Sequence, residues 1–135
     1  MMNNTFDRSR LSISALSERK HDLDLSIIKP LAPFAPGFSG LPEVAADMVG
    51  AIKRKSSLIL MMGAHVIRAG VQRFLIDLMK QGYVSCLAMN GAGMIHDYEF
   101  ALCGATTESV SRYIKDGHFG LWRETGVLND VINRA

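Results

Sequence analysis

The segment from Ser57 to Gly104 constrains the fold of this chain more than any other part of the sequence. Two short apolar runs, Ser57–Met62 and Tyr83–Met89, are each followed by a turn of small residues and then by a helical pattern. Strands that are apolar at nearly every position are typical of parallel sheets, which are covered on both faces. A strand, a glycine turn and a helix, repeated once, predict an α/β fold with a Rossmann-like parallel βαβ unit.

Small residues fill both turns that follow these strands. The first turn is Gly63–His65 and the second is Asn90–Gly93. Ligands of parallel sheets bind beyond the carboxyl ends of the strands, and exposed amides at a helix start attract anions. Neither turn has the GxGxxG spacing of a dinucleotide fingerprint or the GK[ST] ending of a phosphate loop. Two alternatives therefore stay open at these turns, a nucleotide site and a tight turn without a ligand.

Helical patterns surround the two strands. Pro42 stands in the first turn of one predicted helix, which carries an apolar stripe and ends at Lys53–Lys55. A second helix is predicted over Val66–Gln81, with Gly82 as its left-handed cap. The sequence beyond Gly104 is predicted to be helical without a third strand. The unit is therefore expected to be an incomplete, N-terminal part of a doubly wound NAD-binding domain.

The first forty residues are interpreted as an extension. Prolines and glycines in Leu31–Leu41 favour a loop that lies across a surface, with Phe34 and Phe38 as its anchors. We therefore predict an N-terminal extension over residues 1–40 and a partial Rossmann-like domain over residues 41–135.

Composition narrows the class of protein. A hydrophobic content of 48% over 135 residues is ordinary for one globular domain. A formal net charge of +2, with dispersed basic residues, argues against nucleic-acid binding. The sequence has no apolar run of about 18 residues and no secretory leader, so we expect a cytoplasmic protein without a membrane partner. Cys86 and Cys103 lack metal-ligand spacing and are expected to be buried free thiols.

Three polar side chains lie where the second turn leads into its helix. His96, Asp97 and Glu99 are candidates for binding a polar or cationic substrate. His96 and Glu99 are three residues apart and are therefore neighbours on a helix surface. With His65 they offer no third ligand at helical spacing, so no metal site is predicted. The alternative is a histidine–carboxylate hydrogen bond that only fixes the start of the helix.

The order of these motifs resembles the deoxyhypusine synthase family, in its bacterial deoxyhypusine-synthase-like branch. The resemblance is carried by GAHVIRAGVQRFLIDLMKQGYVSCLAMNGAGMIHDYEFALCGATTESV and LWRETGVLND, and runs from about Pro42 to Asn129. Members of that family bind NAD in a Rossmann-like domain and assemble as homo-oligomers, namely tetramers. They transfer an aminobutyl group from spermidine, a polyamine, to a lysine. The resemblance implies an NAD-dependent transferase that acts on a small-molecule substrate.

The resemblance also implies a set of cofactor-binding residues in the two turns. These residues are Gly63, Ala64, His65, Val66, Ile67, Arg68, Asn90, Gly91, Ala92 and Gly93. No catalytic residue is assigned, because the catalytic lysine of the family lies in a later segment without a counterpart here. The chain is therefore expected to be the N-terminal portion of a larger protein, or a truncated one, and inactive by itself.

This sequence departs from the family at both turns. The family's Ser-Asn pair is Ala64-His65 here, and its paired glutamates are Ile95-His96, although Asp97 matches a family acid. An ammonium group needs anionic partners, so the substrate is left as a polyamine or an amino acid. A similar histidine–aspartate pattern occurs in the ornithine cyclodeaminase-like proteins of the arginine dihydrolase group. The alternatives are an NAD-binding relative with that chemistry and a non-catalytic binding or assembly fragment.

Overall fold

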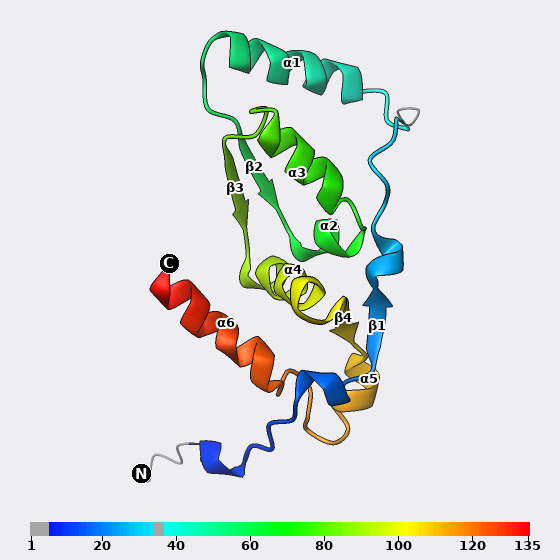
Figure 1. Cartoon of the computed structure of the whole chain (residues 1–135), viewed down its shortest axis with the longest axis vertical. Helices are drawn as coiled ribbons and strands as arrows, with labels where there is room; N and C mark the ends of the chain where they lie inside the picture. The colour runs from blue at the N-terminus through cyan, green and yellow to red at the C-terminus, as the bar shows by residue number, and fades with distance from the viewer. Residues whose placement is uncertain (1–5, 34–36) are drawn as a thin grey trace. The chain divides into compact units, whose positions relative to one another are not determined.

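The computed structural model describes residues 6–33 and 37–135 and divides into two compact units. One unit is Leu25–Asp97, and the other joins the N-terminal segment up to Asp24 with Tyr98–Ala135. The elements are β1 His21–Asp24, α1 Leu41–Lys53, β2 Ile59–Met62, α2 Ala64–Arg68, α3 Gln72–Lys80, β3 Cys86–Met89, α4 Gly91–Cys103, β4 Ala105–Glu108, α5 Val110–Tyr113 and α6 Arg123–Arg134 (Figure 1). These elements confirm the predicted α/β class. The boundary proposed between residues 40 and 41 stays a prediction.

The two predicted parallel strands are neighbours in the Leu25–Asp97 unit. β2 and β3 pair in parallel from Ile59 opposite Cys86 to Met62 opposite Met89. Helix α3 lies beside these strands (Figure 1). Its side chains line a cleft together with Met62, Leu87 and Met89 of the two strands. On β2, Ile59 and Met61 are 60% and 80% exposed. Among the described residues, the face of β2 that carries Ile59 and Met61 is therefore open, whereas the apolar runs predicted cover on both faces.

The helix predicted over Val66–Gln81 is broken into α2 and α3. Gly70 lies in the break with a φ of +76°, a left-handed conformation that glycine adopts without steric cost. A Cβ atom at Gly70 would lie 1.9 Å from the carbonyl oxygen of Ile27. The Gly70 carbonyl also accepts a hydrogen bond of 2.8 Å from the Lys29 amide. The close approach of this preceding segment explains the break, which the periodicity of the helix does not predict.

Helix α1 begins with Pro42 in its first turn and ends at Lys53, close to the predicted bounds. None of its residues is buried, and Val44, Val49 and Ile52 on its apolar stripe are exposed. The helix is therefore predicted correctly, although its apolar stripe has little cover within this chain.

The proline- and glycine-rich loop is only partly described. Phe38 is 66% exposed and does not anchor the loop as predicted, and Phe34 lies outside the described residues. Ala32 and Pro33 of the loop, with Lys29 and Pro30 just before it, line a groove of about 900 Å³ together with Phe74 and Leu78 of α3. This part of the loop therefore runs along α3.

The second unit contains two strands that were not predicted, β1 and β4. β4 follows Gly104, whose φ of +71° ends α4, and pairs antiparallel with β1, where Leu23 lies opposite Thr106. The β-branched Thr106 suits a strand, whereas the segment beyond Gly104 was expected to lead into a helix. The unit packs around an apolar core of Leu16, Phe100, Trp122 and Leu128.

Both cysteines are free, as expected, but they are exposed and not buried. Cys86 stands at the start of β3, and Cys103 is the last residue of α4. Both cysteines thus lie at an end of a strand or helix, where a side chain is exposed more easily than at the centre. The apolar residues around each cysteine had suggested burial.

Among the described residues, no helix combines the length and the apolar character that crossing a membrane requires.

Candidate functional site

A hollow of about 450 Å³ opens at the carboxyl ends of β2 and β3. Its walls are the last residues of the two strands and the first residue of each turn: Met61, Met62, Gly63, Ala88, Met89 and Asn90. Because the strands are parallel and Met62 lies opposite Met89, both turns open at the same edge of the sheet. The structure thus brings the two predicted turns together, where ligands of parallel sheets bind.

Glycines leave space at this edge of the sheet. A Cβ atom at Gly63 or Gly91 would meet no described atom within 4 Å. At Gly93 a Cβ atom would lie 3.0 Å from the sulfur of Met89, so this glycine allows close packing of α4 on the strand. Gly63 and Gly91 therefore leave their backbone open to a ligand, whereas Gly93 serves packing.

Helix α4 starts beside the hollow and has a capping residue. The Asn90 side-chain oxygen accepts a hydrogen bond of 3.2 Å from the Gly93 amide. The amides of Gly91 and Ala92 precede this one and have no acceptor inside a helix. Since α4 is 13 residues long, its positive end adds to their attraction for an anion. The second turn therefore has the chemistry of a phosphate site.

The residues predicted for the first cofactor loop are Gly63, which precedes α2, and the short helix α2 itself. They differ in their exposure to solvent. Gly63 lines the hollow, and His65 is exposed. Ile67 is only 3% exposed and is a core residue. The remaining three are half-buried: Ala64, Val66 and Arg68. Gly63 is thus the residue of this group that borders the hollow.

A second, smaller cleft of about 90 Å³ adjoins the hollow, because Met62 and Met89 line both. Its walls are apolar side chains of the strands, α2 and α3, together with two polar residues, Gln72 and Asp97. Asp97 is one of the predicted substrate residues. Gln72 was missed, and its only sequence signal is a polar residue inside an apolar helical pattern.

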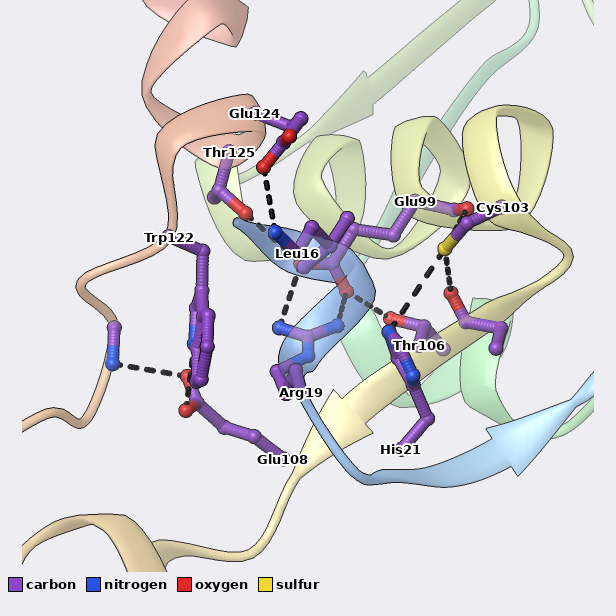
Figure 2. A network of polar contacts seen from close by, with 12 residues as sticks. Leu16, Arg19, His21, Glu99, Cys103, Thr106, Glu108, Trp122, Glu124 and Thr125 are labelled. Atoms are coloured by element: carbon purple, nitrogen blue, oxygen red, sulfur yellow. Dashed lines mark hydrogen bonds and ion pairs between the residues drawn. The ribbon is translucent and has the colours of Figure 1, made fainter. Parts of the chain in front are cut away.

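Glu99 belongs to the other compact unit. Arg19 donates two hydrogen bonds to its carboxylate (Figure 2). They measure 2.9 Å from Nη1 to Oε1 and 2.6 Å from Nη2 to Oε2. The Thr106 and Thr125 hydroxyls donate to the same carboxylate at 2.6 and 3.1 Å. Glu99 is 1% exposed, so its carboxylate is occupied by structural partners and has no open side for a substrate. His96, another predicted substrate residue, is half-buried.

The surroundings of Glu99 keep its carboxylate ionised. Burial raises its pKa, but the hydrogen bonds from Arg19, Thr106 and Thr125 and the charge of Arg19 hold the pKa below its usual value. The Arg19 guanidinium also lies 5.6 Å from the ring centre of Trp122, whose indole N–H donates to Glu108 at 2.7 Å (Figure 2). Sequence reasoning missed Arg19, because residues 7–25 have no regular apolar pattern.

Comparison with protein families identifies a matching Rossmann-fold family. A family model described as arginine dihydrolase ArgZ-like, C-terminal, Rossmann fold matches residues 42–131. The matched range covers two thirds of the chain and includes both glycine turns. Comparisons with curated proteins and with solved structures give no match.

The resemblance to deoxyhypusine synthases is wrong as a family assignment, because the matched family is a different one. Repeated strand, glycine turn and helix are common to Rossmann folds, so their order does not separate one family from another. The aminobutyl transferase function and the polyamine keyword are therefore wrong, and the match supports neither stated alternative. The chain belongs to the arginine dihydrolase ArgZ-like family, as its C-terminal Rossmann-fold domain.

Proposed function

We propose that this chain binds a nucleotide, NAD, as the Rossmann-fold domain of an arginine dihydrolase-like protein. The observation that carries the proposal is the hollow of about 450 Å³ at the carboxyl ends of β2 and β3. Rossmann folds bind their nucleotides at this edge of the sheet. The family match supports the proposal by assigning the fold to residues 42–131.

The residues of the two turns fit the phosphates of a dinucleotide. The amides of Gly91 and Ala92 would donate to a pyrophosphate oxygen, aided by the positive end of α4. The absent side chains of Gly63 and Gly91 leave room for the phosphate group to approach the backbone. No carboxylate lines the described part of the hollow, so no like charge opposes a phosphate there.

The walls of the hollow favour a ligand with flat apolar rings. Met61, Met62 and Met89 offer flexible apolar surfaces on which such rings can pack. The turns lack the Lys and Ser/Thr of a triphosphate-binding loop, which favours a dinucleotide over a nucleoside triphosphate. When bound, NAD would supply a hydride acceptor.

Calorimetric titration of the folded chain with NAD, and separately with ATP, tests this proposal. Saturable binding of NAD, tighter than that of ATP, is the expected result. A chain that is folded by circular dichroism and gives no binding heat with NAD would overturn it.

A further inference from the structure

Cys103 and His21 meet at the end of helix α4. Strand β4 follows α4 directly, and its pairing with β1 brings His21 to this end of the helix, 82 positions away from Cys103 in the sequence. The Cys103 sulfur lies 3.8 Å from Nε2 of His21 (Figure 2). Cys103 is exposed and His21 is half-buried, so the pair is not sealed in the core. The fold thus brings together a thiol and an imidazole, two of the side chains that bind zinc.

The spacing of these two atoms suits a metal ion between them. Zinc bonds of about 2.3 Å to sulfur and about 2.0–2.1 Å to nitrogen, at a tetrahedral angle, place the two donor atoms about 3.6 Å apart. The observed separation of 3.8 Å differs from that value by about 0.2 Å. The two side chains therefore need only a small adjustment to hold a zinc ion.

Backbone carbonyls around the sulfur favour a cation. The Cys103 sulfur lies 3.3 Å from the carbonyl oxygens of Glu99 and Ala105, and a thiol has only one hydrogen to donate. The last carbonyls of α4 also form the negative end of a helix of 13 residues. These dipoles stabilise a positive ion and oppose a bare thiolate, so the site favours a metal-bound sulfur over a free anionic one.

We propose that Cys103 and His21 bind a zinc ion that keeps two further positions open. On binding, the thiol releases its proton to solvent and the sulfur bonds to zinc as a thiolate, while the neutral imidazole bonds through Nε2. Among the described residues, no group of three or more His, Cys, Asp or Glu side chains could hold a metal ion, and the nearby Glu99 carboxylate is paired with Arg19. Water, or a donor atom of a bound molecule, would therefore complete the tetrahedron.

Cobalt serves as the spectroscopic probe, because zinc has no visible spectrum. The test is a titration of the untagged, reduced full chain with Co²⁺ in the absence of nucleotide, so its result does not depend on the proposed NAD site. We expect a thiolate-to-cobalt charge-transfer band that saturates at about one ion per chain and disappears when Zn²⁺ is added, since zinc binds more tightly than cobalt. A folded chain that gives no such band would overturn the proposal.

Matched variants identify the two ligands. Cys103→Ser should abolish the charge-transfer band, whereas Cys86→Ser, at the other exposed free thiol, should retain it. His21→Gln should weaken cobalt binding by about tenfold or more, whereas His65→Gln, at an exposed histidine of α2, should leave it unchanged. If the His21 variant does not fold, the two cysteine variants decide. A band that survives in the Cys103 variant, or equal affinities in the two histidine variants, would contradict the site.

Discussion

Arg19 and Glu99, which are 80 residues apart in the sequence, form a buried bidentate ion pair. Their side chains are 3% and 1% exposed. The pair joins the N-terminal segment to the second half of α4 and thereby holds one compact unit together. Thr106 and Thr125 satisfy further positions on the carboxylate, so the charge of Glu99 is fully partnered.

Replacing Glu99 by Gln should destabilise this unit by about 3–5 kcal/mol, because Arg19 is then a buried charge without a counter-charge. Trp122 is the single tryptophan and lies beside Arg19, so its fluorescence reports this unit during urea unfolding. Glu18→Gln, an exposed position on the same segment, is the control and should change stability by less than about 0.5 kcal/mol. Equal effects of the two substitutions would show that the ion pair does not stabilise the unit.

Acid should weaken the same unit. The pKa of Glu99 is lowered in the folded chain, so its contribution is present above its ordinary pKa and is lost as the pH falls through the folded value. Burial, with the charge of Arg19, also lowers the pKa of His21, which therefore acts in the same direction. The melting temperature followed by Trp122 fluorescence should fall from about pH 7 to about pH 3. Glu99→Gln should flatten this dependence, and a melting temperature that rises on acidification would contradict the assignment.

Gly70→Ala should destabilise the Leu25–Asp97 unit more than Gly82→Ala does. Both glycines have a φ of +76°, so each substitution carries a left-handed strain of about 1–2 kcal/mol. Only at Gly70 would the new Cβ atom also clash with Ile27, since Gly82 has no described atom within 4 Å. Far-ultraviolet circular dichroism during urea unfolding measures both variants. Equal losses would mean that the segment around Ile27 moves aside.

The sequence predicts the parts of the fold that depend on local patterns. The apolar runs give β2 and β3, and Pro42 marks the start of α1, because these signals lie within the elements themselves. The break at Gly70 depends on a distant segment, the one that contains Ile27, and periodicity carries no information about it. The ion pair between Arg19 and Glu99 also joins two distant segments, so local sequence patterns do not predict it.

The candidate site was predictable to a similar extent. Parallel strands bring the turns at Gly63 and Asn90 to one edge, which follows from topology alone. Gln72 was not predictable as a cleft residue, because its burial depends on the packing of α3 against the strands. Glu99 was predicted to bind a substrate because it lies three residues after His96 in a helix. The second half of α4, which contains Glu99, belongs to the other compact unit.

Gly91→Val should lower NAD affinity about tenfold or more, because the new side chain would occupy the space that the proposed phosphate needs. Gly91 does not have a positive φ, and its Cβ would meet no described atom within 4 Å, so the fold should be preserved. Gly126→Val on α6 is the matched control, since a Cβ there also meets no described atom. Calorimetry gives the affinities, and unchanged NAD affinity in the Gly91 variant would remove the second turn from the site.

The methyl signal of Met61 during an NAD titration tests nucleotide binding most directly. Met61 is 80% exposed and lines the hollow, whereas Met48 lies on α1 and Met79 lines only the small cleft. We predict a saturable shift at Met61 with NAD, while Met48 and Met79 stay unchanged. Binding of NAD that shifts other methionines and leaves Met61 unchanged, or no shift at all in the folded chain, would contradict a nucleotide site at the ends of β2 and β3.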